Sequence, residues 1–458
     1  MPIISPLNAS TPSPIEPRSA FADNVEKDNP ELQEVKLKQI AQNNPAVNLF
    51  LQLAIIPTPT VRPGHEKENE MKRKMEEGMT LYAQAFKELG VPKKNIERDN
   101  YGSLIIHVPA SPGYENKQSL MFMGHMDIVP ADLKDPTRAI HPRLIMHQTQ
   151  NGLKEYIATD GTTTLGADDK ACLAAIYYVV KTLIEKNIPH PPFEIIVAPD
   201  EEEEGSSMVN LDASKFDSKY VIVIDDDKAF KITFGCGSFV NIKIDIDGLK
   251  GGHSAEYKEN QDSIISAADI LKELHERIGN RVIKYFSDFQ EVPLISKNIY
   301  EYEIDKSASN RIPTGGHLYL SLRSNEKELE DKEVIKIEQA VKEIEDKYKN
   351  TEPNLKIKIN IHREMPPWNG DPKSLIATSL IQSANEIGQE KVKIAPSHGA
   401  TQVNNLAGKK NHRGEEFVPV IIGVESEDWH KTEEKVSWES IIETGNWLVR
   451  LVENYTKL

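Results

Sequence analysis

Residues 169–200 read "DKACLAAIYYVVKTLIEKNIPHPPFEIIVAPD", a helix pattern followed directly by a strand pattern. In the first half, apolar residues recur at helical spacing, at positions 173, 176, 179, 180 and 183. The second half contains "FEIIVAP", a continuous apolar run that is typical of a strand buried on both faces. A helix that leads into such a strand is the repeating unit of an α/β sheet. The stretch therefore predicts an α/β fold with a mostly parallel sheet.

Similar patterns occur on both sides of this stretch. Three more apolar runs have strand length, namely "SLMFMGHMD" (119–127), "YVIVIDDD" (220–227) and "FVPVIIGV" (417–424). Helices are predicted around residues 373–388 and 437–455. Because strands and long helices alternate, we expect the segments before and after residues 169–200 to belong to the same α/β domain.

The pattern changes after Gly237. "FVNIKIDID" (239–247) alternates apolar and polar residues, as a strand with one exposed face does. A helix, two strands, a second helix and a last strand follow, which gives the order βαββαβ of a ferredoxin-like α+β domain. We therefore predict a disordered or extended tail and an α/β domain that is interrupted by an inserted α+β domain. Their bounds are 1–45 for the tail, 46–237 and 364–458 for the α/β domain, and 238–363 for the insertion.

Composition limits the partners of the 458-residue chain. The formal net charge is -16, from 55 Lys and Arg against 71 Asp and Glu, which argues against nucleic acid or an anionic membrane as a partner. The chain has only two cysteines, Cys172 and Cys236, so a reducing compartment, the cytoplasm, is expected. No apolar run has the length of a membrane span, and residues 1–21 lack the pattern of a secretory signal.

Imidazole and carboxylate side chains follow the predicted strands or precede a predicted helix. Open α/β sheets bind ligands at the carboxyl ends of their strands, so these side chains are expected to share one site. His125 and Asp127 are two residues apart at a strand end and should point the same way. The full set is His125, Asp127, Asp168, the acidic run Glu201 to Glu204, Asp225 and His430.

The chemistry of this set favours a metal centre. Histidine and carboxylate ligands without cysteine suit Zn²⁺ and, less selectively, Mn²⁺ or Co²⁺. Several carboxylates close together repel one another unless cations neutralise them, which favours two metal ions. Water activated by metal, with a glutamate as base, can attack an amide at neutral pH. The set therefore predicts metal-assisted hydrolysis.

Each of these residues also has an ordinary structural explanation. A lone histidine is usually structural, an aspartate before a helix is a common N-cap, and four glutamates in a row usually form a solvated surface. Residues 225–227 could be turn residues, and His430 could be a surface histidine. The prediction therefore depends on their joint placement and on no single motif.

With these residues placed, the sequence resembles the dizinc exopeptidase family that includes peptidase T, aminoacylase, carnosinase and succinyl-diaminopimelate desuccinylase. Within that family it looks most similar to peptidase T. The segment "ATDGTTTLGADDKACLAAI" is very similar to the family's metal-bridging segment. It is followed, in the expected order, by "APDEE", "FDSKYVIVID" and "HKTEEKV". The resemblance covers nearly all of the chain after about residue 45.

The resemblance implies a role for each residue of the set. One zinc ion would be bound by His125, Asp168 and Asp225, and the other by Asp168, Glu202 and His430. Asp168 would thus bridge the two ions, and the peptide bond to Asp169 is expected to be cis. Asp127 would orient the imidazole of His125. Glu201 would act as the base that takes a proton from water and delivers it to the leaving amine.

The acidic run leaves the choice of glutamates open. Family members commonly have one residue fewer between Asp200 and Gly205. Counting from Asp200 gives Glu201 as the base and Glu202 as the ligand, whereas counting from the glycine gives Glu202 and Glu203. We favour the first, because the strand fixes the residues nearest to its end and a loop absorbs an extra residue at little cost. Glu203 and Glu204 are then expected to be solvated.

The resemblance also assigns the inserted domain as a lid and dimerisation domain, which implies a homodimer. Its candidate substrate-binding residues are His253, in "GLKGGHSA", and Asn310 and Arg323, in "SASNRIPTGGHLYLSLR". His253 could polarise the substrate carbonyl across a dimer, and Arg323 could pair with a terminal carboxylate. Each could instead be an ordinary surface residue. The segment "PSHGATQVNN" (396–405) departs from the family pattern, and the role of His398 within it is unassigned.

The expected function is that of a tripeptidase-like dizinc aminopeptidase of small peptides. One alternative is another amidohydrolase of the same family, namely a dipeptidase, a carboxypeptidase or an N-acyl amino acid deacylase. A second alternative is a catalytically inactive, metal-dependent binding protein. None of the metal ligands that the resemblance implies is missing from the sequence, which favours an enzyme.

Overall fold

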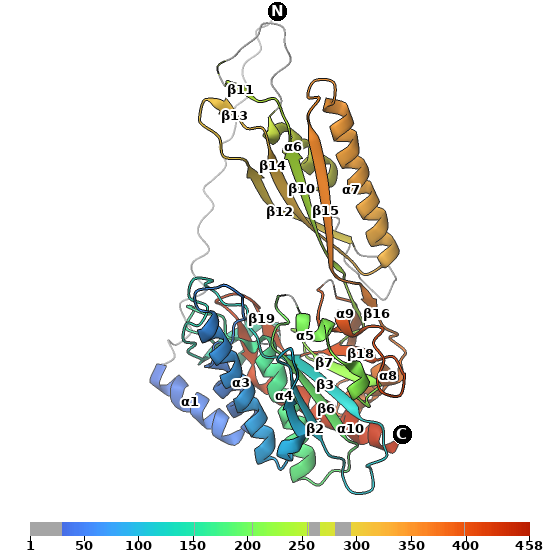
Figure 1. Ribbon diagram of the computed structural model, residues 1–458. Coiled ribbons are helices and arrows are strands. Elements are labelled where there is room, and N and C mark those ends of the chain that lie inside the picture. Colours follow the sequence, from blue (N-terminus) through green and yellow to red (C-terminus); the bar gives the residue numbers. More distant parts are fainter. Residues whose placement is uncertain are drawn as a thin grey trace, which may run out of the picture.

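The computed structural model describes residues 30–150, 152–203, 205–253, 255, 266–279, 295–397 and 399–458. It contains an α/β body and an elongated α+β segment that projects from it (Figure 1). The α/β class with an inserted α+β segment is as the sequence predicts.

The α/β body is built on an eight-stranded sheet. Its four inner strands β6, β3, β7 and β18 run parallel to one another, and β2 joins β6 in antiparallel fashion at one side. The strands in spatial order are β1 (Ile96–Arg98), β2 (Leu104–Val108), β6 (Phe193–Ala198), β3 (Leu120–His125), β7 (Tyr220–Ile224), β18 (Val418–Ile422), β8 (Lys231–Thr233) and β17 (Lys393–Ala395).

The inner strands are apolar throughout because both faces of the sheet are covered. In β3, Leu120 and Phe122 belong to the main hydrophobic core, whereas Met121 and Met123 belong to a smaller core on the other face. The main core is closed by long helices, and the smaller core by the short helices α5 and α9. The helices are α2 (Pro45–Ala54), α3 (Glu68–Glu88), α4 (Ala167–Glu185), α5 (Ser206–Val209), α8 (Leu375–Glu386), α9 (Gln402–Leu406) and α10 (Trp438–Lys457).

A second, four-stranded sheet lies beside the body and was not expected from the sequence. Its strands are β19 (Ser426–Glu427), β20 (Lys435–Ser437), β5 (Gly152–Ala158) and β4 (Arg143–Thr149). The pairing of β20 with β5 brings the segment that follows His430 against the loop that leads to Asp168. This sheet therefore connects two parts of the predicted site.

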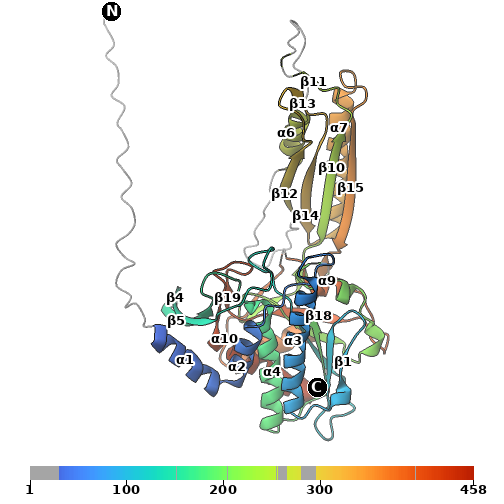
Figure 2. The ribbon, with the colours of Figure 1, turned by 60° about the vertical axis from the view of Figure 1, so that its left-hand side comes forward.

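The expectation of a disordered or extended tail over residues 1–45 is wrong for residues 30–43. Helix α1 (Pro30–Asn43) packs against α2 and β4 (Figure 2). Leu37 and Ile40 are buried in the main core, which explains why this mostly polar segment is helical. The expectation for residues 1–29 lies outside the described residues.

The inserted segment forms a sheet of its own. Its two central strands, β10 and β14, alternate buried and partly exposed residues, since α6 and α7 cover only one face. The chain leaves and re-enters the body through the paired strands β9 (Gly235–Cys236) and β16 (Trp368–Asn369). The elements in chain order are β10 (Phe239–Asp247), β11 (Gly252–His253), α6 (Ala267–Ile278), β12 (Ile295–Ile304), β13 (Arg311–Ile312), β14 (Gly316–Ser324), α7 (Lys327–Tyr348) and β15 (Lys356–Met365).

Among the helices of the described ranges, none combines the length with the apolar character that crossing a membrane requires.

Candidate metal centre

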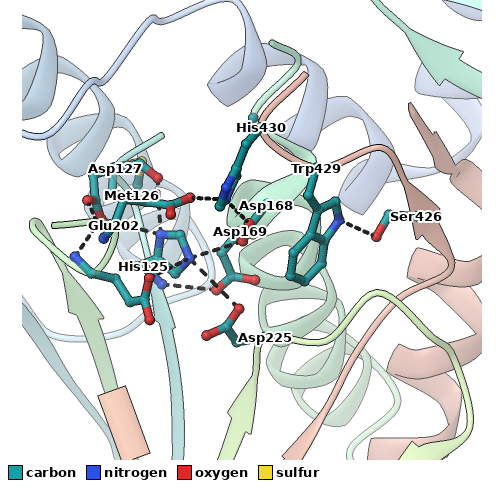
Figure 3. Close-up of polar contacts among 12 residues, drawn as sticks. His125, Met126, Asp127, Asp168, Asp169, Glu202, Asp225, Ser426, Trp429 and His430 are labelled. Carbon is teal, nitrogen blue, oxygen red and sulfur yellow. Dashed lines mark hydrogen bonds and ion pairs between the residues drawn. The ribbon is translucent and has the colours of Figure 1, made fainter. Parts of the chain in front are cut away.

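The predicted site residues meet at one edge of the central sheet. His125 is the last residue of β3, Asp225 follows β7, and Glu201 and Glu202 follow β6 in the first turn beyond it. These three strands are neighbours, and each is buried, so their carboxyl ends are held at fixed spacing. Asp168 lies in the first turn of α4, whose start faces the same edge (Figure 3).

Asp168 lies between the two histidines. Its Oδ1 is 3.1 Å from Nε2 of His125, and its Oδ2 is 3.1 Å from Nε2 of His430. The same nitrogen of His430 is 3.1 Å from Oε1 of Glu202. The side chains of His125, Asp168 and Glu202 are buried, whereas that of His430 is 47% exposed. The cluster is therefore open to solvent where His430 lies.

Two further carboxylates complete the cluster around His125. Oδ1 of Asp225 is 3.9 Å from Nε2 of His125, and Oε2 of Glu201 is 4.0 Å from it. Two sets, His125 with Asp168 and Glu202, and His125 with Glu201 and Asp225, each bring one ligand atom per residue within 4.8 Å of the others. Histidine and carboxylate groups at this spacing are the ligand set of a divalent metal site.

The arrangement of hydrogen bonds fits a cation in the cluster. Nδ1 of His125 is 3.0 Å from the carbonyl oxygen of Asp127 and 3.3 Å from its carboxylate, so this nitrogen donates its proton there. With Nδ1 protonated, Nε2 faces carboxylate oxygens, which is favourable when this nitrogen also carries a proton or when a metal cation lies between them. Oδ2 of Asp225 is buried and has no hydrogen-bond partner among the described residues. The residues therefore fit a bound metal ion.

The charges of the cluster lead to the same conclusion. Burial, and then the charge of Asp225, raises the pKa of Glu201 well above its ordinary range. Burial, and then Asp168, raises the pKa of Glu202 to about 8. Burial also raises the pKa of Asp225 to about 7. The protein alone places too little positive charge near these three acids to keep them ionised, and a bound cation would supply that charge.

Asp168 has the opposite shift. Burial opposes its charged form, but hydrogen bonds from His125 and His430 outweigh burial and lower the pKa of Asp168 to about 2. The same contacts with Asp168 and Glu202 raise the pKa of His430 to about 11. Asp168 is thus the carboxylate around which the positive charge of the cluster is arranged.

Asp127 is fully buried and is hydrogen-bonded to the segment that carries Glu201 and Glu202. Its Oδ1 accepts a hydrogen bond from the backbone N–H of Glu201, and its Oδ2 accepts one from that of Glu202, each at 3.0 Å. The hydroxyl of Thr60 donates a third, at 2.7 Å. Together with its contact to His125, these bonds tie the imidazole to the acidic loop. Asp127 thus contacts the imidazole and the acidic loop at the same time.

The acidic run divides between the site and the surface. Glu201 and Glu202 face the cluster, whereas Glu203 forms an ion pair with Arg62 at the rim. This placement supports counting from Asp200, with Glu202 and not Glu203 beside His430. Glu204 lies outside the described residues.

Sequence reasoning missed several residues that contact the predicted ligands or the segments that carry them. The peptide bond between Asp168 and Asp169 is cis, which confirms that expectation. The carboxylate of Asp169 accepts a hydrogen bond from the N–H of His125 at 2.9 Å. It can approach this closely because residue 124 is glycine, where a Cβ atom would collide with it. Asp169 is next to the predicted ligand Asp168 in the sequence, and this adjacency is the signal that could have identified it.

Two more buried charges were missed because they look like ordinary charged residues in the sequence. Glu434 accepts hydrogen bonds from the loop that leads to Asp168. Lys170 is fully buried, and its ammonium donates to the carbonyl oxygen of Ile56 at 2.7 Å. No sequence pattern separates either residue from a solvated charge.

The structure does not bring the residues of the inserted segment to the cluster. His253 in β11 and Asn310 beside β13 are exposed, and both views show these strands at the end of the segment farthest from the body (Figures 1 and 2). Arg323 lies near the other end of β14, with its guanidinium 4.4 Å from the centre of the Phe239 ring. Among the described residues, no acidic side chain forms an ion pair with it. His398 lies outside the described residues.

With this geometry established, comparisons with known proteins place the chain in a family. The sequence profile of "Peptidase family M20/M25/M40" matches residues 121–454, which is more than half of the chain and includes every residue of the cluster. The chain is similar to the uncharacterized protein YqjE of Bacillus subtilis (strain 168), with 26% identity over 418 residues. That match covers 89% of this chain and 97% of the relative.

Named peptidases are among the similar proteins. Peptidase T from Halothermothrix orenii is 26% identical over 219 residues, 42% of this chain and 52% of the relative. The chain therefore spans about half the length of that peptidase. The crystal structure of a tripeptidase from Staphylococcus aureus subsp. aureus mu50 superposes with a TM-score of 0.70 at 21% identity. It covers 90% of this chain and 98% of that chain, and at this identity it shows a shared fold.

Proposed function

The chain belongs to Peptidase family M20/M25/M40, and from this premise we propose that it is a dizinc aminopeptidase that hydrolyses the N-terminal peptide bond of small peptides, as a tripeptidase does. One observation carries the proposal: Asp168 contacts both histidines, with Glu202 and Asp225 beside them and Glu201 at the edge. That arrangement provides ligands for two metal ions and a separate acid for proton transfer. The named relatives support a peptidase with a small substrate.

We assign the ligands as two groups that share one carboxylate. His125, Asp168 and Asp225 would hold one ion, and Asp168, Glu202 and His430 would hold the other. When bound, the two ions supply Lewis acidity, which lowers the pKa of water and polarises the carbonyl of the peptide. Zinc is the proposed metal because imidazole and carboxylate ligands suit it, and Mn²⁺ or Co²⁺ are possible substitutes.

Glu201 is the proposed base. Its side chain is 11% exposed, and its Oε2 is farther from His125 than the oxygen of Asp168 is, so it borders the cluster and has access to a substrate. Oε2 would accept a proton from the attacking water and then donate it to the leaving amine. Asp127 would keep this geometry by holding the backbone N–H groups of Glu201 and Glu202 and the imidazole of His125.

The inserted segment is proposed to act as a lid and as the dimerisation domain of a homodimer. His253 and Asn310 lie at its far end, so within one chain they do not reach the cluster in this arrangement. Either closure of the lid or the lid of a partner would be needed to bring such groups to the substrate. Arg323, at the near end, is proposed to pair with the terminal carboxylate of a peptide. The two cysteines are free and buried, which is in keeping with the proposed cytoplasmic location.

A panel of peptides tests the proposal against the other activities of the family. We expect hydrolysis of tripeptides with a free amino group, with release of the first residue, and little hydrolysis of their N-acetylated forms. The rates are measured by chromatography of the products. Matched dipeptides and C-terminally amidated tripeptides serve as controls for chain length and for the carboxylate. Hydrolysis of only the blocked peptides would instead show a deacylase or a carboxypeptidase, and the proposed activity would be wrong.

A further inference from the structure

Glu434 is a buried acid that the proposed reaction does not use. It is 1% exposed, and both oxygens of its carboxylate are occupied by backbone donors. Oε2 accepts from the N–H of Leu165 at 2.7 Å and from that of Gly166 at 3.0 Å. Oε1 accepts from the N–H of Asp168 at 3.1 Å. A single side chain thus satisfies three backbone donors in the loop that carries the shared carboxylate.

These three donors have few other partners. They lie at the start of α4, where the first N–H groups of a helix cannot bond within it. Asp168 and Asp169 have non-helical backbone angles, so the helix does not fix the direction of the Asp168 side chain by itself. Because buried backbone donors need acceptors, the carboxylate of Glu434 specifies where this loop lies.

Glu434 is also connected to the second histidine. It is four residues from His430, which has a left-handed backbone, φ 63°, that a non-glycine residue rarely adopts. The segment between them is fixed to the same loop, since the hydroxyl of Thr159 donates to the carbonyl oxygen of Thr432 at 3.1 Å. Strand β20, which begins at the next residue, pairs with β5. The segments of Asp168 and His430 therefore form one connected unit.

We propose that Glu434 is a positioning residue that holds Asp168 and His430 at the spacing needed to bind metal, without being a ligand itself. Its oxygens face backbone N–H groups, and it belongs to none of the potential ligand sets within the described residues. Loss of its carboxylate would leave every proposed ligand present but remove three of the hydrogen bonds that tie the loop of Asp168 to the segment of His430. The inference rests on the dimetal part of the proposed function and not on the identity of the substrate.

The substitution Glu434→Gln tests this inference, with Glu433→Gln as the matched control. Glutamine keeps the size of the side chain, but its amide lacks one acceptor and the charge. Glu433 is the neighbouring residue, is exposed, and contacts only the hydroxyl of Thr432 among the described residues. We expect Glu434→Gln to bind Zn²⁺ about 10- to 100-fold more weakly in a competition titration with a chelator, as loss of a group that supports ligands does. The absorption spectrum of bound Co²⁺ should change, while Glu433→Gln should match the wild type in both measurements.

A role in folding alone is separated by the thermal midpoint with and without metal. A general effect on stability lowers the midpoint equally in both states, whereas weaker binding reduces the increase that metal produces. If Glu434→Gln does not fold, Glu434→Asp, which keeps the charge but not the reach, should show the same reduced increase. Wild-type affinity and an unchanged Co²⁺ spectrum in Glu434→Gln, or in Glu434→Asp where only that variant folds, would overturn the inference. If the wild type itself bound no divalent metal, the proposed function would fail first.

Discussion

Glu201→Gln should lower kcat for tripeptide hydrolysis by about 100- to 10,000-fold while both metal ions remain bound. Glutamine has the shape of glutamate but cannot accept the proton of the attacking water, so proton transfer is lost and the ligands are kept. Oε2 of Glu201 borders the cluster at 4.0 Å from His125, close enough to serve a substrate there. The measurements are steady-state kinetics and metal content by elemental analysis.

Glu203→Gln is the matched control for this prediction. It makes the same change two residues further along the acidic run, where Glu203 contacts Arg62 and not the cluster. We expect nearly wild-type activity and metal content from it. Undiminished hydrolysis by Glu201→Gln would refute the proposed base. Loss of metal from Glu203→Gln would instead favour Glu202 as the base and Glu203 as the ligand.

Asp168→Asn should remove activity and metal binding together. Asp168 contacts both His125 and His430, so a neutral amide at this position weakens both proposed metal sites at once. We expect the affinity for metal to fall by more than about 100-fold, the upper end for loss of a residue that only supports ligands. Elemental analysis after gel filtration and a titration with Zn²⁺ measure the effect.

Asp160→Asn provides the control for that change. Asp160 lies in the same loop but is exposed, and within the described part of the chain its carboxylate accepts only local hydrogen bonds from Thr162. It should bind metal and hydrolyse peptide as the wild type does. If Asp168→Asn kept two tightly bound ions, Asp168 could not be the shared ligand.

The strands and the placement of the proposed ligands at one edge of the sheet could be predicted from the sequence because both follow from local patterns. Strands such as β6 and β7 are buried on both faces, and this leaves a continuous apolar run in the sequence. Parallel strands then place whatever follows them at one edge of the sheet. Glu202 and Asp225 each follow such a strand, so the rule that parallel strands end at one edge was enough to predict that they lie near His125.

The residues that support the ligands could not be predicted, because their burial depends on distant pairing. Glu434 stands beside Glu433 in a charged segment, and nothing local distinguishes the buried residue from the exposed one. Glu434 is buried because β20 pairs with β5, and β5 belongs to a sheet whose strands alternate irregularly in exposure. Helix α1 was missed for the same reason, since Leu37 and Ile40 are buried only in the assembled core, where α1 packs against α2 and β4.

For the inserted segment, the order of the elements could be predicted but its orientation could not. Its order of elements was predictable from the alternation in β10 and β14, because one face of its sheet meets helices and the other does not. Its orientation relative to the body was not predictable, since it depends on the short paired strands β9 and β16. The proposed roles of His253 and Asn310 depend on that orientation and on a partner or a closing movement.

The most direct test of the central claim is the titration of metal-free protein with Zn²⁺ while hydrolysis of a free tripeptide is followed. The metal is removed with a chelator, and the chelator is removed before the titration. We predict no hydrolysis without metal, recovery on addition of Zn²⁺, and a maximum close to two equivalents per chain. Hydrolysis that proceeds at the same rate in the metal-free protein would contradict the account.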